Sequence, residues 1–260
     1  MPTALVTGAN RGIGLAVAQQ LAERGYRVWL GARDKARGRT AEAQLREKGL
    51  NVTWLSLDVA DAASVDAAAE TVAQATPVLD ALVNNAAISR ERDGEMVRPY
   101  PPSELPIANL REMFDVNFFG AVAVTQAFLP LLRAAEGGRI VNVSSGLGSF
   151  GFNTGGDDEL NRSLNILGYK TSKAALNMAT VLFARELEAT AIKVNAASPS
   201  SPTPGPVATD LSGPGRAEVL KAQGFGTAEE GAETVVHLAN LPADGPTGVF
   251  YDINAGLFPW

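Results

Sequence analysis

The sequence lacks cysteine altogether and has a single histidine, and these two shortages exclude several kinds of chemistry. Without cysteine the chain has no disulfides, no thiolate nucleophile and no cysteine-based metal site, which fits a reducing cytoplasm. The histidine, His237, falls inside an expected helix and is assigned no role. We therefore expect no metal centre, and any proton donor must be another side chain.

Excess positive charge and long hydrophobic runs are also missing. The 22 basic residues are outnumbered by 28 acidic ones, so the net charge of −6 offers no basic surface for nucleic acid or for an anionic membrane. The N-terminus has no basic region followed by a long apolar run, and no apolar run looks long enough to span a bilayer. We expect a cytoplasmic protein with neither nucleic-acid nor membrane partners.

What the sequence does contain is the composition of an ordinary globular protein. Its 260 residues are 46% apolar and 19% charged, with no internal repeat and no Gly/Ser-rich linker. Folds that mix helices and strands often form one domain of this length. We expect a single α/β domain over 1–260.

Three glycines follow the first expected strand, Thr3 to Thr7. Gly8, Gly12 and Gly14 precede a segment with helical periodicity that stops at Gly25. Strand, glycine-rich turn and helix form the layout that cradles a pyrophosphate, because glycines let the backbone approach the phosphates at a helix N-terminus. The spacing, G-x-x-x-G-x-G, differs from the G-x-G-x-x-G of long-chain dehydrogenases. A plain tight turn is the alternative, and the flanking strand and helix favour the nucleotide site.

The end of the second expected strand, Tyr26 to Leu30, bears on the choice of cofactor. An acidic residue here binds the ribose 2′-hydroxyl of NAD, whereas an arginine suits the 2′-phosphate of NADP. Ala32 takes the acidic position and Arg33 follows it, so Arg33 and Arg11 would form a cationic clamp for that phosphate. Solvated surface charges are the alternative. Asp34 is expected to cap the following helix.

Strands and helices alternate along the rest of the chain. This order predicts a Rossmann-type, doubly wound parallel sheet of about seven strands, with helices on both faces and ligands at the carboxyl ends of the strands. Residues 88–107 are interpreted as a surface connection, with Arg90, Arg92 and Glu95 solvated, and 197–225 as a loop. The further expected strands are 51–57, 79–83, 139–145, 192–196 and 248–253, and the further expected helices are 35–48, 61–75, 108–134, 169–189 and one that opens with a capping box at Thr227.

Ser145, Tyr169 and Lys173 are the candidate reactive residues. Residues four apart lie on one face of a helix, so the Lys173 ammonium can approach the Tyr169 phenol, and a neighbouring cation would lower the pKa of that phenol. The hydroxyl could then exchange a proton nearer to neutral pH. Ser145 ends a buried strand, where its hydroxyl can hydrogen-bond a substrate oxygen. A bare Tyr-x-x-x-Lys is weak evidence, because the two residues meet at that spacing on many exposed helices.

Several motifs in a fixed order give the chain a wider resemblance. Together they resemble the short-chain dehydrogenase/reductase superfamily over essentially the whole length; they are Thr7-Gly8-x-x-x-Gly12-x-Gly14, Asn84-Asn85-Ala86, Asn117, Ser145 and Tyr169-x-x-x-Lys173. The residues around Arg11 and Arg33 resemble the NADPH-dependent carbonyl reductases of that superfamily. The resemblance implies an NADP(H)-dependent oxidoreductase that reduces small ketones or aldehydes to alcohols. It also implies a dinucleotide-binding part over about 1–145 and a catalytic and substrate part over about 145–260, with a homo-oligomer left open.

The resemblance further implies a role for each motif residue. Tyr169 would donate the proton, Ser145 would polarise the carbonyl oxygen, and Lys173 would bind the nicotinamide ribose. Asn117 would hold a water that links Lys173 to solvent. The cofactor itself would lie against Gly8, Asn10, Arg11, Gly12, Ile13, Gly14, Arg33, Asp58, Val59, Asn85, Tyr169, Lys173, Val207 and Thr209.

Three places depart from the family pattern, and the first is Ala87, which stands where the family has glycine. Ser145 and Tyr169 are 24 residues apart (169 − 145), which is longer than usual in that family. The extra stretch contains apolar side chains, among them Phe150, and an acidic run, 157–159, that suits the first turn of a short helix. It would form either one wall of the substrate pocket or an oligomer contact. The Pro/Gly turn after 192–196 has two possible registers, and the preferred one, at Pro204-Gly205, gives Thr209 the contact with the cofactor carboxamide.

Two other functions remain open. An NAD-linked alcohol dehydrogenase or a 3-oxoacyl reductase would use the same scaffold; the arginines argue against NAD, and nothing in the sequence excludes an acyl substrate. A cofactor-binding sensor would keep the fold without the chemistry, but a pure binder has no need of a proton donor such as Tyr169.

Overall fold

Short runs rich in valine, leucine and alanine form the strands of one sheet in the computed structural model, which describes residues 1–91, 99–155, 164–200, 207–209, 211 and 215–260. Within these residues the strands are β1 Thr3–Thr7, β2 Arg27–Ala32, β3 Val52–Ser56, β4 Ala81–Asn84, β5 Arg139–Val143, β6 Lys193–Ala197, β7 Phe250–Asp252 and β8 Gly256–Leu257. They form one eight-stranded sheet in the order β3-β2-β1-β4-β5-β6-β7-β8. Neighbouring strands are parallel except β7 and β8, which are antiparallel.

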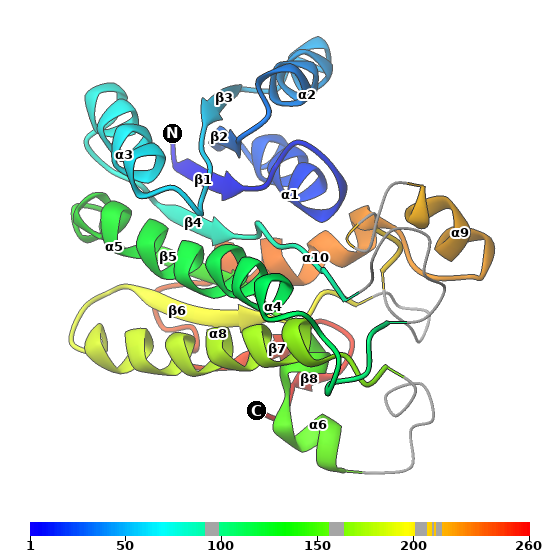
Figure 1. Ribbon diagram of the computed structural model, residues 1–260. Helices are drawn as coiled ribbons and strands as arrows, with labels where there is room; N and C mark the ends of the chain where they lie inside the picture. Colours follow the sequence, from blue (N-terminus) through cyan, green and yellow to red (C-terminus); the bar gives the residue numbers. More distant parts are fainter. Residues whose placement is uncertain (92–98, 156–163, 201–206, 210, 212–214) are drawn as a thin grey trace.

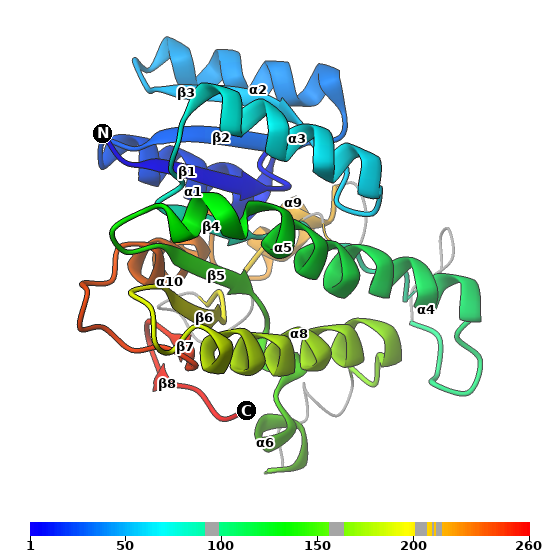
Figure 2. The same cartoon turned by 90° about the vertical axis from the view of Figure 1, so that its left-hand side faces the viewer.

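Two layers of helices cover the sheet, one on each face (Figures 1 and 2). One layer contains α1 Gly12–Glu23, α2 Lys35–Glu47 and α10 Ala228–Ala239, and the other contains α3 Ala62–Ala75, α5 Gly120–Arg133 and α8 Leu167–Glu186. Successive residues of a strand point to opposite faces of a sheet. In β1, Ala4 and Val6 accordingly belong to the core under the first layer, and Leu5 between them belongs to the core under the second.

The predicted doubly wound sheet is therefore confirmed, with one strand more than expected. The additional strand, β8, has two residues and begins at Gly256, whose φ of 74° makes the sharp return from β7. The expectation of an unbroken loop over 197–225 is wrong, because α9, Arg216–Ala222, lies within it. Both elements are too short for a periodic pattern of apolar residues to reveal them.

Several helices begin at side chains that cap them. Asp34 accepts a hydrogen bond from the Arg37 N–H at 2.9 Å, as predicted, and Asp61 accepts one from the Ala63 N–H at 3.0 Å. Thr227 forms the predicted capping box at the start of α10. Each cap pairs an N–H group that the first turn of a helix otherwise leaves without a partner.

One long helix runs from Ile107 to Arg133. It consists of α4 Ile107–Phe114, a π-helical segment Asp115–Phe119, and α5. Among the described residues it is the one helix long and apolar enough to cross a membrane by length and composition, so the expectation that no run is long enough is wrong by that measure. The fold accounts for its apolar character in another way, since one side of it is packed into the core through Met113, Val124, Phe128 and Leu132.

The segment 88–107 is more than a surface connection. Glu91 is buried, and Asn117 holds the main chain of Ile88 through hydrogen bonds. Arg90 is exposed and forms an ion pair with Glu112 at 3.2 Å, as expected of a solvated residue. The expectation therefore holds for Arg90 but not for the connection as a whole. Arg92 and Glu95 lie outside the described residues.

A chain of four buried polar side chains links two strands to the helices that cover them. The Asn84 amide nitrogen donates to Thr125 Oγ1 at 2.9 Å and to Asn142 Oδ1 at 2.8 Å. The Asn142 amide nitrogen donates in turn to Thr180 Oγ1 at 2.9 Å. This polar chain joins α5, β4, β5 and α8 just before β4 and β5 reach the edge of the sheet where ligands are expected.

Candidate active site

The glycine-rich turn lies between β1 and α1 and cannot carry side chains at its key positions. Gly8 and Gly12 have φ values of 64° and 54°, in the left-handed region that favours glycine. A Cβ at Gly14 would overlap the Asn85 amide and would lie 2.5 Å from the Gly8 carbonyl oxygen. The turn therefore presents bare backbone at the N-terminus of α1, as a phosphate cradle requires. The remaining predicted residues of this turn are Asn10 and Ile13, both half-buried, and Arg11, which is exposed.

Hydrogen bonds hold the end of β4 against this turn. Thr7 Oγ1 accepts the N–H groups of Asn85 and Ala86, both at 2.9 Å, and the Asn85 amide nitrogen donates to the Thr7 carbonyl at 2.8 Å. The strand order changes direction between β1 and β4, and open α/β sheets bind their ligands at such a switch point. The structure thus brings Asn85 and the glycine turn together at the expected place.

The candidate residues for the adenosine end of a cofactor follow β2 and β3. Arg33 is exposed directly after β2, and the described residues offer it no ion-pair partner. The Ala9 N–H donates to the Gly31 carbonyl at 3.0 Å, so the glycine turn lies beside the end of β2. After β3, Asp58 is half-buried and Val59 is buried. These positions surround one edge of the sheet, as the sequence predicts for a bound dinucleotide.

Ser145 and Tyr169 meet at the carboxyl end of β5. Ser145 precedes a short 3₁₀ turn, Gly146–Gly148, and its Oγ accepts the Leu147 N–H at 3.2 Å. Tyr169 lies in the first turn of α8, is 9% exposed, and adjoins the Ser145 side chain. Burial raises the pKa of Tyr169 to about 12, and the Ser145 side chain opposes that rise. The phenol therefore keeps its proton at neutral pH, as a proton donor must.

Lys173 is buried beside the tyrosine but is bonded to the sheet. Its Nζ lies 5.7 Å from the centroid of the Tyr169 ring and donates to the Val143 carbonyl at 2.7 Å. Burial lowers the pKa of Lys173 to about 7. The expectation that Lys173 lowers the pKa of Tyr169 is therefore wrong for the protein alone, because the dominant effect on the phenol is its removal from water.

Asn117 lies in the π-helical segment and ties the loop after β4 to α8. Its Oδ1 accepts the Ile88 N–H at 2.8 Å, and its amide nitrogen donates to the Ile88 carbonyl at 2.9 Å and to Ser172 Oγ at 3.1 Å. Short π-helical segments inside α-helices are frequent at functional sites. Asn117 thus lies in the same cluster as the reactive residues. A water bound through it stays a prediction.

Sequence reasoning gave no role to Glu91, which lies directly against the reactive tyrosine. Its Oε1 accepts the main-chain N–H of Tyr169 at 2.5 Å, although the two residues are 78 positions apart. One signal could have pointed to it. The helix with the reactive tyrosine has Ile166 at its N-cap, which has no side-chain acceptor, so any side-chain cap must come from elsewhere in the chain.

The two predicted cofactor residues of the later loop lie in a short described piece. Val207 is buried and forms a parallel bridge with Gly226, and Thr209 is half-buried. Pro204 and Gly205, on which the choice of register depends, lie outside the described residues. The contact of Thr209 with the cofactor carboxamide therefore stays a prediction.

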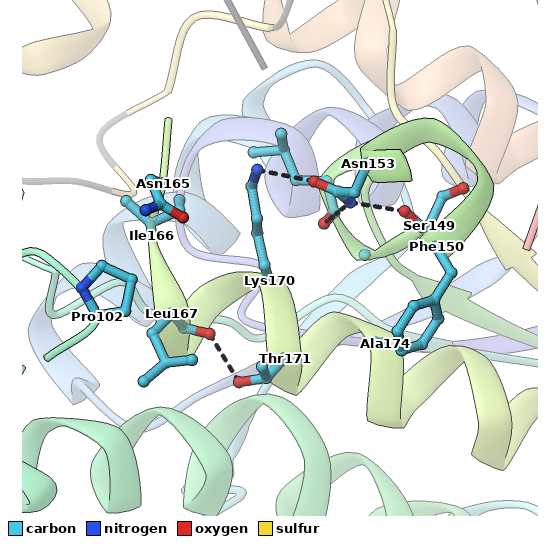
Figure 3. Close-up of a pocket in the computed structure, with 12 residues that line it drawn as sticks. Pro102, Ser149, Phe150, Asn153, Asn165, Ile166, Leu167, Lys170, Thr171 and Ala174 are labelled. Atoms are coloured by element: carbon cyan, nitrogen blue, oxygen red, sulfur yellow. Dashed lines mark hydrogen bonds between the residues drawn. The ribbon is translucent and has the colours of Figure 1, made fainter. Parts of the chain in front are cut away.

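A cavity of about 460 Å³ lies beside the start of α8 (Figure 3). Its walls include Lys170, Thr171 and Ala174 of that helix but neither Tyr169 nor Lys173, so it adjoins the reactive pair rather than enclosing it. Lys170 Nζ donates to Asn153 Oδ1 at 2.7 Å across the cavity.

The extra stretch between Ser145 and Tyr169 forms part of this wall. It includes α6, Phe150–Thr154, and Phe150 and Asn153 both line the cavity. Near the end of the stretch, Ile166 and Leu167 line the cavity as well. The acidic run 157–159, where a short helix is predicted, lies outside the described residues, as does Leu160.

Comparison with known proteins decides the family. The family model for short chain dehydrogenases matches residues 2–219. The chain belongs to the short-chain dehydrogenase family. A short-chain dehydrogenase of Penicillium roqueforti, anuI, is 37% identical to it over 247 residues, which cover 92% of this chain and 88% of that protein.

Two solved structures share the fold of this short-chain dehydrogenase. The NADPH-bound carbonyl reductase from chicken fatty liver superimposes with a TM-score of 0.81 and 28% identity, over 100% of this chain and 99% of that one. A 3-oxoacyl-[acyl-carrier protein] reductase with bound NAD from Brucella melitensis gives a TM-score of 0.78 and 28% identity, over 100% and 92%. The dehydrogenase is thus an oxidoreductase that resembles carbonyl reductases and binds a nicotinamide dinucleotide.

The residues of the dehydrogenase fit such a dinucleotide. The turn after β1 has no room for a Cβ at Gly14 and needs glycine at Gly8 and Gly12, which leaves a cradle of bare backbone. An exposed arginine, Arg33, follows β2 at the adjoining edge. The half-buried Ser145 hydroxyl, the buried Tyr169 hydroxyl and the buried Lys173 ammonium lie at the end of β5, on the other side of the switch point.

Proposed function

We propose that this short-chain dehydrogenase is an NADPH-dependent reductase that converts ketones or aldehydes to alcohols. The observation that carries the proposal is the pair of adjoining hydroxyls, Ser145 and Tyr169, with the buried Lys173 one helical turn away. A dinucleotide-binding sensor would have no use for a buried phenol that keeps its proton and is aligned by a second hydroxyl. The arrangement suits proton donation to an oxygen atom.

The reaction divides between the cofactor and the protein. When bound, the reduced nicotinamide supplies the hydride. Ser145 and Tyr169 would both hydrogen-bond the substrate carbonyl oxygen, which orients the substrate and stabilises negative charge as it develops there. Tyr169 would then give its proton to that oxygen. Lys173, buried beside the ring, would stabilise the phenolate that remains.

The choice of NADPH rests on Arg33. Its guanidinium is exposed at the strand end where a dinucleotide-binding fold recognises the adenosine ribose, and it suits a 2′-phosphate in charge and geometry. Likeness to the NADPH-bound carbonyl reductase supports the same choice. Likeness to the NAD-bound 3-oxoacyl reductase supports a second candidate, reduction of an acyl substrate on the same scaffold. A turnover screen of ketones, aldehydes and keto esters with each cofactor separates the two.

The first prediction concerns the proton donor. Tyr169→Phe removes one hydroxyl from a buried ring, so the fold and the glycine turn should persist while turnover falls by about 10²-fold or more. Ketone-dependent oxidation of NADPH measures the chemistry, and a fluorescence titration measures cofactor binding. Tyr251→Phe is the matched control, because Tyr251 lies in β7, where it stacks on His237 of α10, away from the reactive residues. Undiminished turnover by Tyr169→Phe would exclude this tyrosine as the donor.

The second prediction concerns cofactor choice. Arg33→Asp removes a charge-assisted contact with the 2′-phosphate, worth about 1.5–3 kcal/mol, so the KM for NADPH should rise about tenfold or more. The KM for NADH should change much less, since aspartate can accept from the ribose hydroxyls. Arg24→Asp, at the far end of α1, is the control for a general loss of positive charge. A wild-type enzyme that uses NADH as well as NADPH would contradict the assignment.

A further inference from the structure

The helix that holds the reactive tyrosine lacks a cap of its own. In α8 the N-cap is Ile166, and Gly168 and Tyr169 are the second and third residues of the first turn. The N–H groups of a first turn have no partners within the helix. The other caps described above come from Asp34, Asp61 and Thr227, each adjoining the helix that it caps. At α8 the sequence offers no such neighbour.

Glu91 supplies the missing acceptor from the loop after β4. Its Oε1 accepts the Tyr169 N–H at 2.5 Å, and Gly168 adjoins the same carboxylate oxygen. A carboxylate at a helix N-terminus is favoured by the positive end of the helix dipole. The bond is short, as expected when the acceptor is charged. The group that anchors the first turn of α8 therefore bonds to the main chain of the reactive tyrosine itself.

The surroundings are built to let this carboxylate approach. A Cβ at Gly168 would overlap the Met113 side chain and would lie 3.3 Å from Glu91 Oε1, so glycine leaves the room that the contact needs. The Glu91 carbonyl accepts the Tyr100 N–H at 2.7 Å, and the Arg90 N–H lies 3.3 Å from Met113 Sδ. The main chain of Arg90 and Glu91 is thus held in place.

Burying the Glu91 carboxylate costs free energy, which argues that this cap does more than begin a helix. Glu91 is 4% exposed, and its Oε2 is buried with no hydrogen-bond partner among the described residues. It lies beside the apolar cluster that includes Met113 and Tyr169. Burial raises the pKa of Glu91, whereas the main-chain N–H groups of Tyr169 and Gly168 lower it. An exposed cap such as Asp61 starts its helix without burying a carboxylate.

We propose that Glu91 is a positioning residue for Tyr169: its carboxylate anchors the first turn of α8 and so fixes where the phenol meets the substrate oxygen. The inference rests on the proposed function of Tyr169 as proton donor. Because small displacements of a reacting group lower rates steeply, loss of the anchor should reduce turnover more than it reduces cofactor binding.

The test compares Glu91→Leu, which removes both acceptor oxygens, with Glu91→Gln, which keeps one. We expect Glu91→Leu to lower kcat at least tenfold while the Kd for NADPH, from fluorescence titration, stays within twofold. Glu91→Gln should recover most of the lost kcat. Glu42→Leu is the matched control, since Glu42 is similarly buried on α2 and pairs with Arg39. It should leave kcat within twofold of wild type.

Hydrogen exchange measures the contact between Glu91 and the first turn of α8 without depending on turnover. The amides of Gly168 and Tyr169 should exchange at least tenfold faster in Glu91→Leu than in wild type, and near wild-type rates should return in Glu91→Gln. Should Glu91→Leu fail to fold, Glu91→Asp, shorter by one methylene, replaces it, and kcat and amide protection should fall together.

Two results would overturn the proposal. One is a wild-type kcat for Glu91→Leu at a temperature where it is folded, which would leave Glu91 a purely structural cap. The other is an equal loss of kcat in Glu91→Leu and Glu91→Gln with normal amide protection, which would assign the effect to charge rather than position. If instead the wild type reduces no carbonyl compound, the proposed function fails, and the exchange experiment still decides whether Glu91 anchors Tyr169.

Discussion

At the scale of single residues, burial sets the titration of the two central groups in opposite directions. A phenol is neutral when it carries its proton, whereas an ammonium is charged, so removal from water favours the protonated tyrosine and the deprotonated lysine. The pKa of Tyr169 rises to about 12 and that of Lys173 falls to about 7. In the protein alone the pair therefore tends toward neutrality just above pH 7.

The third prediction follows from Lys173. Its folded-state pKa of about 7 is below the ordinary value of 10.5, so between these two pH values the folded state binds fewer protons than the unfolded state. The free energy of unfolding should therefore rise with pH across that window. We expect Lys173→Met to be more stable relative to wild type at pH 6 than at pH 10, because methionine removes the cost of burying a cation.

Urea denaturation at the two pH values measures the difference in stability. Lys48→Met, on the exposed C-terminal end of α2, is the control for replacing a lysine that is not buried. A Lys173→Met difference that is the same at pH 6 and pH 10 would mean that the folded-state pKa lies near its ordinary value.

At the scale of elements, the 3₁₀ turn after Ser145 packs on α8 without room for one extra carbon. A Cβ at Gly148 would lie 2.7 Å from the Lys173 Cβ and 2.8 Å from its carbonyl carbon. The Asn177 amide bridges the same two elements, accepting from Ser144 Oγ at 2.6 Å and donating to the Gly148 carbonyl at 3.2 Å. This close approach sets the separation between the turn that begins at Ser145 and the helix that carries its partners.

The fourth prediction is that Gly148→Ala forces these two elements apart. The overpacking should lower the free energy of unfolding by about 1–3 kcal/mol. Turnover should fall as well, because Ser145 moves relative to Tyr169. Calorimetry and steady-state kinetics measure the two effects. Gly137→Ala is the control, since a Cβ there has the end of the Arg139 side chain as its nearest neighbour, at 3.2 Å. Equal effects of the two substitutions on stability and turnover would show that the close packing of Gly148 against α8 is not the cause.

What the sequence could predict depends on how far apart the interacting residues are. Local signals sufficed for β1 and its glycine turn and for the caps at Asp34 and Thr227. They failed where the partner is distant or the element is short. Glu91 acts on a helix 78 positions away, and no pattern within 88–107 reveals that contact. The pKa of Tyr169 also escaped prediction, because helical spacing places Lys173 near the ring but says nothing of burial or of the Val143 carbonyl that the ammonium meets.

At the scale of the whole molecule, the candidate residues come from the ends of several strands and the start of one long helix. Asn85, Ser145 and Tyr169 are brought together only when the sheet is complete. A ligand that contacts all of these ends binds the folded chain and not the unfolded one. Binding should therefore be visible as stability of the entire fold.

The fifth prediction is that NADPH raises the melting temperature more than NADH at the same concentration. At a hundred times its Kd a ligand stabilises the folded state by about 2.7 kcal/mol, which for a domain of this size corresponds to roughly 5–10 °C. Arg33→Asp should abolish the advantage of NADPH over NADH. A thermal-shift titration with both cofactors measures this without any substrate. Equal shifts for the two cofactors with the wild type would contradict a phosphate contact at Arg33.

The buried polar chain affects the register of the sheet; its members are Thr125, Asn84, Asn142 and Thr180. If a parallel strand shifted by two residues, the same side of the strand would still face the core. Hydrophobic packing alone therefore does not exclude a shift of register by two residues. The bond between Asn84 and Asn142 opposes such a shift, because the shift would leave the buried Asn142 amide oxygen without its partner. Asn84 directly precedes Asn85, and Asn142 precedes Ser145 by three positions. This hydrogen bond thus helps to fix the register of β4 and β5, and with it the relative position of the loops that carry Asn85 and Ser145.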